Sequence, residues 1–265
     1  MLPLICLDVD GTLVGSAGEP SEALWRSAEA ARGRGQRLTL CTARLAAGPT
    51  RGWAERLDPD GWHVFHTGAV RWHPVTGEVR TEALTVGEVE LCAEAGERNG
   101  WVVETYTWDD YAVEVDHPLA VAHAGLLDMP FRMRHRSDLE GEIVRMQFVV
   151  PIEDCDRALT VPLPGLDASA ATSPVMPDAA FVSITRAGVS KASGVAAVAH
   201  DLGVDMADVM MVGDGHNDLP AIETVGWGVA MSNAAPELHK AARLVVADVD
   251  DDGAAEAIDR SAGLI

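Results

Sequence analysis

Short uninterrupted apolar runs follow one another at the start of the chain. Residues 4–7 form one such run, and residues 37–42, which contain Leu38, Leu40 and Cys41, are predicted to form a second strand. Between them, apolar residues recur at helical spacing over residues 21–32. Uninterrupted runs of this length are typical of strands that are buried on both faces of a parallel sheet. The order strand, helix, strand therefore predicts a βαβ unit.

The far end of the chain repeats this pattern. Helical spacing alternates with short apolar runs, which predicts helices at 194–202, 219–225 and 236–242 and strands at 209–213, 228–231 and 244–246. We therefore expect both ends of the chain in one α/β sheet, a Rossmann-like parallel-sheet core.

The middle of the chain has a different pattern. Apolar and polar residues alternate, which predicts strands at 101–106, 111–115 and 143–150, with helices at 86–98 and 152–159. Alternation indicates a sheet with one face covered, as in an inserted α+β domain. The expected domains are a first core part (1–83), the insert (84–183) and a second core part (184–265). Within the insert, residues 162–177 have no clear period and are predicted to be a loop.

Charge narrows the choice of partners. The 265 residues include 41 acidic and 20 basic side chains, which gives a net charge of -21. Nucleic acid and anionic lipid both require clustered basic residues, so neither is expected as a partner. No apolar run reaches the roughly 18 to 20 residues of a membrane span, and residues 1–7 do not resemble a leader. We expect a cytoplasmic protein.

Cysteine spacing indicates no redox or zinc chemistry. The four cysteines lie far apart without a Cys-x-x-Cys pair, and two of them lie in apolar runs. Neither disulfides nor a zinc site are expected.

Paired acidic residues follow two of the predicted core strands. Asp8 and Asp10 come after the first strand, and Asp214 and Asp218, with Asn217 between them, come after the strand at 209–213. Asp-Gly is also common in turns, so one pair alone could simply cap a helix or form a turn. Two such strand ends can together build an oxygen-rich Mg²⁺ site.

Two further segments suggest phosphate binding. Thr42 ends the second predicted strand, where its hydroxyl and the backbone N–H of the following Ala43 could hold phosphate oxygens. Lys191 comes just before a predicted helix and is one of only two lysines, the other being Lys240. A lone lysine is usually a solvated surface residue, but the position of Lys191 between the insert and the last acidic strand end favours a role in the site.

These segments, in this order, resemble the haloacid dehalogenase superfamily of phosphatases, and most closely its Cof-type subfamily. The resemblance spans about residues 4–83 and 184–259. It rests on ordered motifs that match the nucleophile loop, the second and third motifs, the metal motif and two subfamily motifs: residues 8–13, Thr42, Lys191, residues 213–218, residues 66–69 and residues 230–235. Ala43 stands where the family often has glycine, and Thr67 where it usually has asparagine.

The resemblance implies a Mg²⁺-dependent phosphatase that forms an aspartyl-phosphate. Asp8 would be the nucleophile, and Asp10 the general acid and then the general base. Asp8, Asp214 and the backbone carbonyl of Asp10 would hold the metal. The charge on phosphate would be stabilised by three groups: Lys191, Thr42 and Asn217. Asp218 would either orient Lys191 or complete the metal shell.

The insert would be a cap that excludes water and selects the substrate. Four aromatic residues could line it, although packing in its interior is the commoner role: Trp101, Tyr106, Trp108 and Tyr111. Three histidines are expected in loops or in the core rather than at a metal: His63, His66 and His73. The acidic run at 248–252 is expected to be a solvated turn.

The expected substrate is a small soluble phosphate monoester, with a sugar phosphate as first choice. Three alternatives stay open: a phosphomutase, a catalytically silent phosphate-binding protein, and a protein whose main role is dimerisation through the cap. Monomer and homodimer are both compatible with the sequence.

Overall fold

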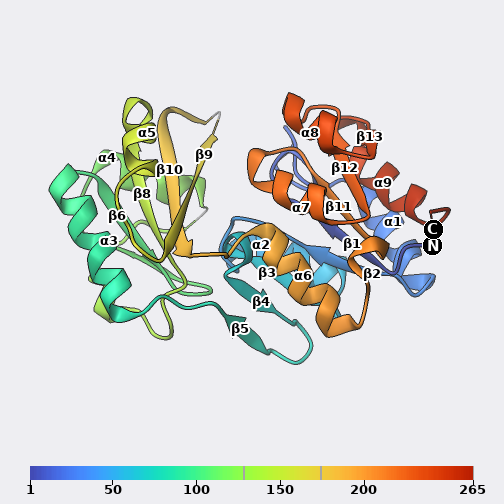
Figure 1. The fold of residues 1–265 in the computed structure, drawn as a ribbon, viewed down its shortest axis with the longest axis horizontal. Helices are drawn as coiled ribbons and strands as arrows, with labels where there is room; N and C mark the ends of the chain where they lie inside the picture. Colours follow the sequence, from blue (N-terminus) through green and yellow to red (C-terminus); the bar gives the residue numbers. More distant parts are fainter. Residues whose placement is uncertain (128, 174, 265) are drawn as a thin grey trace. The chain divides into compact units, whose positions relative to one another are not determined.

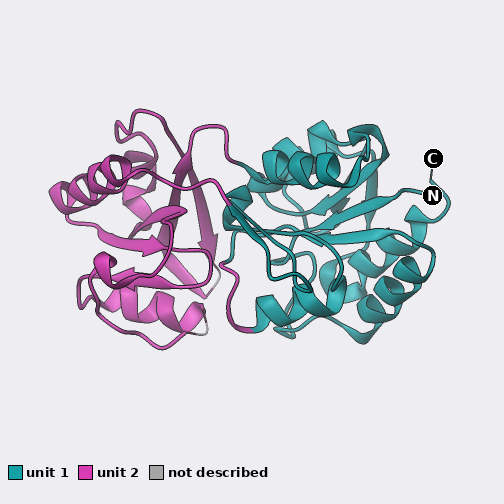
Figure 2. Cartoon of the chain, turned by 90° about the horizontal axis from the view of Figure 1, so that it is seen from below, with its two compact units in different colours: residues 1–44, 49–80, 190–265 teal, residues 45–48, 81–189 magenta. Residues whose placement is uncertain are grey.

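The computed structural model describes residues 1–127, 129–173 and 175–264, and the chain divides into two compact units (Figure 2). Unit 1 comprises residues 1–44, 49–80 and 190–265, and unit 2 comprises residues 45–48 and 81–189. Unit 2 thus extends beyond the insert expected at 84–183. It also includes residues 45–48, which no feature of the sequence had assigned to it.

Five parallel strands form the central sheet of unit 1 (Figure 1). In spatial order they are β13 (Leu244–Val246), β12 (Trp227–Met231), β11 (Val209–Gly213), β1 (Leu4–Leu7) and β2 (Arg37–Leu40). The β1 strand is fully buried and pairs in parallel with β11 and β2. The two ends of the chain therefore share one sheet, as predicted.

Helices cover both faces of this sheet (Figure 1). On one face lie α1 (Glu22–Gly33) and α9 (Gly253–Ser261), and the other helices of unit 1 are α2 (Gly48–Leu57), α6 (Lys191–Leu202), α7 (Leu219–Thr224) and α8 (Pro236–Ala241). Ser21 caps α1 by accepting from the N–H of Leu24. The α6 helix begins three residues earlier than residue 194, because the Ser190 side chain caps it.

A small antiparallel sheet that the apolar pattern did not predict extends from the core. It contains β3 (His63–Phe65), β4 (Val70–Trp72) and β5 (Val79–Thr81). Each strand has only three residues, which is too short for a period to be recognised.

Unit 2 contains an antiparallel sheet of five strands (Figure 1). In spatial order they are β7 (Tyr111–Val113), β6 (Val102–Tyr106), β8 (Arg145–Pro151), β10 (Met176–Arg186) and β9 (Leu166–Ser173). Its helices are α3 (Val86–Asn99), α4 (Pro118–Leu126) and α5 (Cys155–Leu159).

The expected loop at 162–177 is wrong over most of its length. Leu166–Ser173 form the edge strand β9, and β10 starts at Met176; Pro174 lies outside the described residues. Small side chains conceal this strand in the sequence, because alanine and serine have low β-propensity. At the edge of the sheet β9 pairs with β10, and most of its side chains alternate between half-buried and exposed, because successive strand residues point to opposite faces.

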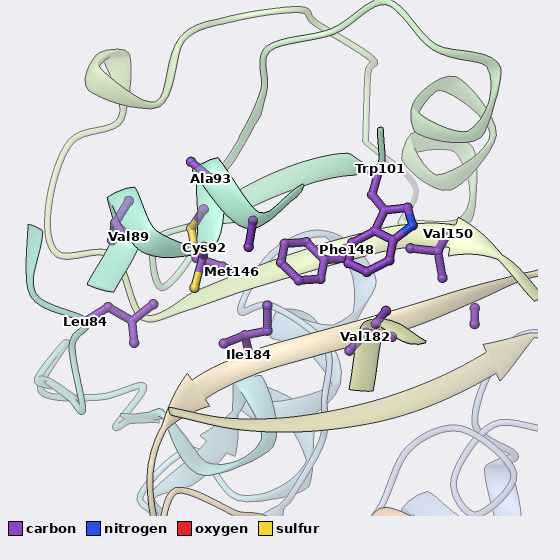
Figure 3. Packing of buried hydrophobic residues seen from close by; sticks show 13 residues of the cluster. Leu84, Val89, Cys92, Ala93, Trp101, Met146, Phe148, Val150, Val182 and Ile184 are labelled. Atoms are coloured by element: carbon purple, nitrogen blue, oxygen red, sulfur yellow. The ribbon is translucent and has the colours of Figure 1, made fainter. Parts of the chain in front are cut away.

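The two faces of the unit 2 sheet carry separate apolar clusters. On one face, Trp101 and Phe148 pack with their ring centroids 5.2 Å apart, in a cluster that also contains residues of α3 and α5 (Figure 3). On the other face, Tyr106 and Val149 pack with residues of α4 and with Leu45 from the 45–48 segment. Because successive strand residues point to opposite faces, β6 and β8 contribute to both clusters.

A buried polar network lies beside the second cluster. The carboxylate of Glu104, which is fully buried, accepts hydrogen bonds from Tyr106 Oη at 2.6 Å and from Gln147 Nε2 at 3.0 Å. His123 Nδ1 lies 2.9 Å from the same carboxylate. Buried polar groups are costly unless paired, so this network fixes how α4 packs on the sheet.

Among the helices of the described residues, none is long and apolar enough to cross a membrane.

Candidate active site

The carboxyl ends of neighbouring strands bring the predicted motifs together. The β1 strand lies between β2 and β11, with Leu7 opposite both Leu40 and Val212. Asp8, Thr42 and Asp214 therefore leave the sheet at the same edge. This is the edge at which ligands bind in open α/β sheets.

Lys191 links two of the acidic residues. As the first residue of α6 it is almost fully buried, and its Nζ donates to Oδ1 of Asp8 and to Oδ1 of Asp218, both at 2.6 Å. It also lies 3.3 Å from Oδ1 of Asn217. The expectation that Lys191 belongs to the site, and not to the solvated surface, agrees with this geometry.

Asp218 holds the acidic loop in place through its second oxygen. Its Oδ2 accepts from the N–H groups of Asp214 and Gly215, at 3.2 and 3.0 Å. The same carboxylate therefore shapes the loop and contacts Lys191. Of the two roles expected for Asp218, the orientation of Lys191 is the one with direct contacts.

The buried acids strongly influence one another. Burial raises the pKa of Asp8 well above its ordinary value, and the charge of Asp218 adds to this rise. Burial, and then Asp218, raises the pKa of Asp214 to about 6. For Lys191, burial acts to lower the pKa, but the carboxylates of Asp218 and Asp8 outweigh it and raise the pKa. Three carboxylates thus face one lysine, and a further cation would relieve the excess negative charge.

The donor set suits a hard divalent cation. Asp8, Asp214 and Asp218 each offer a carboxylate oxygen, and these atoms all lie within 4.8 Å of one another. Oxygen ligands of this kind are those that Mg²⁺ prefers. The side chain of Asp10 is not in this group, and the metal contact expected of its backbone carbonyl stays a prediction.

Two features orient Asp214 from the nucleophile loop. Thr12 Oγ1 donates to Oδ1 of Asp214 at 2.9 Å. Gly11 has a φ of 81°, and a Cβ atom at this position would lie 2.2 Å from Oδ2 of Asp214. The Asp-Gly-Thr sequence thus lets the loop pass directly against the acidic residue, which a larger side chain would prevent.

The second motif forms a tight turn after β2. Thr42 is fully buried, and its hydroxyl accepts from the N–H of Arg44 at 3.1 Å. Its carbonyl accepts from the N–H of Thr67, which lies in a turn with positive φ. The hydroxyl of Thr42 also carries a hydrogen that it can donate, and the adjacent Ala43 is half-buried.

Asp10 differs from the other acids because its side chain is 62% exposed and pairs with Arg44. The guanidinium donates from Nη2 to Oδ1 at 2.5 Å and from Nε to Oδ2 at 3.0 Å. No role for Arg44 was predicted, although its place two residues after Thr42 was a usable signal.

Two other residues contribute contacts to the site but were given no role from the sequence. Thr12 was quoted only as part of the nucleophile loop. Asn233, which had been noted only within a subfamily motif, donates from Nδ2 to the carbonyl of Gly11 at 2.9 Å and accepts from the N–H of Val249 at 3.2 Å. It thereby connects the nucleophile loop to the acidic run near the end of the chain.

The residues considered for the cap and the histidines mostly pack in the interior. Trp101, Tyr106 and Tyr111 belong to the apolar clusters of unit 2, and Trp108 is half-buried. His63 is fully buried: its Nδ1 accepts from the N–H of Leu40, so its Nε2 donates to the carbonyl of Asp58 at 2.9 Å.

Comparisons with known proteins identify the family. Residues 169–258 match the model of haloacid dehalogenase-like hydrolases. A protein of Bacillus subtilis named as a phosphatase, YxeH, is 30% identical over 267 residues, which cover 97% of each chain. The chain belongs to the haloacid dehalogenase superfamily, and the resemblance to its Cof-type members is confirmed.

Solved structures agree with this assignment. A haloacid dehalogenase-like hydrolase from Bacteroides thetaiotaomicron is 26% identical with a TM-score of 0.85, and the match covers 98% of this chain and 99% of that one. The subclass IIB sugar phosphatase BT4131 is 22% identical with a TM-score of 0.82 over 98% and 99% of the two chains, which shows a shared fold. The protein is therefore an enzyme of the phosphatase class, with an α/β core and an inserted cap, unit 2.

Proposed function

We propose that the enzyme is a Mg²⁺-dependent phosphatase that hydrolyses a small soluble phosphate monoester through an aspartyl-phosphate on Asp8. One observation carries this proposal: Lys191 pairs with Asp8 and Asp218 beside Asp214, at the carboxyl edge of the sheet. A buried lysine among three carboxylates is suited to balance the charge of a bound phosphate.

The first step is the attack of an Asp8 carboxylate oxygen on phosphorus. The O–P bond to Asp8 forms as the ester P–O bond breaks, and the leaving oxygen takes a proton from Asp10. In the second step a water attacks the phosphoryl group, gives its proton to Asp10 and releases phosphate and Asp8. Covalent catalysis of this kind divides one difficult displacement into two easier ones.

Neighbouring groups hold the phosphoryl oxygens during both steps. Lys191 and the hydroxyl of Thr42 would donate to them, together with the N–H of Ala43 and the side-chain amide of Asn217. Asp8, Asp214 and the carbonyl of Asp10 would hold Mg²⁺, and Asp218, which orients Lys191, would complete the metal shell if it also binds the ion. When bound, the ion would offset the repulsion between these carboxylates and the phosphate.

A sugar phosphate or a related metabolite is the proposed substrate. A similarly folded enzyme is a sugar phosphatase, and the net charge of -21 disfavours large polyanions. Unit 2 would supply the contacts that select the leaving group.

The test is the substitution Asp8→Asn, with Asp208→Asn as a matched control on an exposed turn. Turnover of phosphate monoesters in Mg²⁺, and the phosphoryl-enzyme trapped by acid quench, should both be lost in Asp8→Asn and be normal in the control. Incorporation of ¹⁸O from labelled water into the released phosphate would identify hydrolysis, rather than transfer of the phosphoryl group back to a sugar. Near-normal turnover by Asp8→Asn would refute the covalent mechanism.

A further inference from the structure

Arg44 forms a bidentate ion pair with Asp10. Both carboxylate oxygens of Asp10 accept from the guanidinium, at 2.5 and 3.0 Å. Only arginine offers this fork of parallel donors, which fixes the plane of a carboxylate as well as its position. The Asp10 side chain is 62% exposed, so much of it faces solvent, and the ion pair with Arg44 restrains it.

Other residues of unit 1 hold Arg44 in turn. Its Nη1 donates to Oγ1 of Thr50 at 3.3 Å, and its guanidinium carbon lies 5.4 Å from the ring centre of Trp53. Both residues are on α2. An exposed ion pair contributes little to stability, so this arrangement is better explained by the orientation that it gives to Asp10.

The chain immediately after Arg44 belongs to unit 2. Residues 45–48 are part of that unit (Figure 2). Leu45 is buried in the apolar cluster with Tyr106, and the N–H of Ala46 donates to the carbonyl of Trp108 at 3.1 Å. Arg44 is thus bonded covalently to a segment that is packed into the cap, while its own contacts are with the core.

We propose that Arg44 is a positioning residue that orients Asp10 for proton transfer, and that residues 45–48 make this orientation depend on the cap. This inference rests on the proposed function, because it assigns Asp10 the acid and base roles given above. Arg44 acts on the reaction only through Asp10, and the phosphate is held by other groups.

The first experiment compares Arg44→Met with Arg51→Met, a control on α2 whose guanidinium packs over Trp72. Two substrates are used: an alkyl phosphate, whose leaving oxygen needs a proton, and 4-nitrophenyl phosphate, whose leaving oxygen does not. Arg44→Met should lower kcat/KM about tenfold for the alkyl phosphate and less than threefold for the nitrophenyl ester. Inhibition by inorganic phosphate should be unchanged, and Arg51→Met should behave as wild type. Weaker inhibition by phosphate in Arg44→Met would mean that Arg44 binds the phosphoryl group, and would overturn the proposal.

A double-substitution cycle separates positioning from a general structural effect. In an Asp10→Asn background, Arg44→Met should cause no further loss, because the group that it orients is already disabled. Equal losses in both backgrounds would overturn the inference. That result would leave the proposed function intact, because the proposed function is tested separately by the turnover of Asp8→Asn.

The dependence on the cap is tested at Leu45. Leu45→Ala, with Leu45→Val as a milder variant, should reproduce the selective loss on the alkyl phosphate. Val113→Ala is the matched control, because Val113 is buried in the same apolar cluster but is not joined to Arg44. Val113→Ala should lower the melting temperature by a similar amount, and it should reduce kcat/KM equally for the two substrates. The same selective loss in Val113→Ala, or none in either Leu45 variant, would overturn the link to the cap.

Discussion

The Nζ of Lys191 lies 2.6 Å from Oδ1 of Asp8, although the two residues are 183 positions apart in the chain. Asp8 follows a central strand and Lys191 begins a helix that starts after the cap. The contact therefore exists only when both parts of the core are assembled. It also places a positive charge beside Asp8, the proposed nucleophile, which is almost entirely buried.

Lys191→Met should lower turnover by roughly 10²- to 10³-fold, because it removes the positive charge from the phosphate site. Without Lys191, Asp8 is buried with no cation beside it, and burial holds its pKa above that in the unfolded chain. The folded state then binds more protons than the unfolded state, so stability falls as the pH rises. Melting temperatures should show a larger loss at pH 8 than at pH 5.

Lys240→Met is the control for this experiment, because Lys240 is the other lysine and is exposed. It should leave turnover and melting temperature close to those of the wild type. Similar losses at the two lysines would contradict the role assigned to Lys191.

Calcium should bind the site and inhibit. Mg²⁺ holds octahedral geometry at about 2.0 to 2.1 Å and would leave one oxygen of Asp8 free to attack. Ca²⁺ is larger and readily takes a carboxylate through both oxygens, so it would occupy the nucleophile. Either ion should raise the melting temperature by binding the folded state. Rates at fixed Mg²⁺ and increasing Ca²⁺ should show competition, and full activity in calcium alone or in excess chelator would contradict this role of the metal.

Gly68→Ala should disturb the start of α6. Gly68 has a φ of 107°, and a Cβ atom there would lie 2.1 Å from the carbonyl oxygen of Ser190, the residue before Lys191. The clash and the backbone strain should cost about 1 to 3 kcal/mol and lower kcat by displacing Lys191. Gly77→Ala is the control, since Gly77 also has a positive φ but has open space around it. Denaturant unfolding and kcat measure the two effects, and equal behaviour of both variants would contradict the close approach to α6.

His63 should make the protein less stable in mild acid. Burial lowers the pKa of His63 to about 4. In the unfolded chain the residue titrates near its ordinary value of about 6.5, so between these pH values the unfolded state binds more protons. Its contribution is fully present above about pH 6.5 and is lost as the pH falls to 4, which amounts to about 3 kcal/mol.

An NMR titration of the histidine rings tests this directly. The ring of His63 should stay neutral as the pH is lowered to about 4. Protonation of His63 near pH 6.5 in the folded protein would refute the prediction.

The core and the acidic groups were predictable because the signals are local. An apolar run followed by Asp8 or Asp214 indicates a strand end, and parallel strands bring their ends to one edge. Arg44 was not predictable in the same way. Its role depends on the exposed side chain of Asp10, which a strand pattern does not orient.

Unit 2 was harder to predict for a different reason. Its sheet was expected, but β9 is composed mainly of small residues, and its packing depends on β10. The assignment of residues 45–48 to unit 2 could not be predicted. Leu45 directly follows a core motif in the sequence, and it contacts its apolar partners only in the folded structure. The polar network around Glu104 likewise joins residues from β6, β8 and α4 that are distant in sequence.

The interrupted path of the chain has a consequence for biosynthesis. While the ribosome is still producing unit 2, the nascent chain already contains β1 and β2, but β1 lacks its second neighbour, β11. One edge of an entirely apolar strand then has no partner until residues 209–213 emerge, and such edges promote aggregation. All residues of unit 2 have been synthesised by residue 189, before β11 emerges. Chains that terminate prematurely after unit 2 would carry this unpaired edge and lack Lys191, which makes them substrates for chaperones and proteases rather than slow versions of the enzyme.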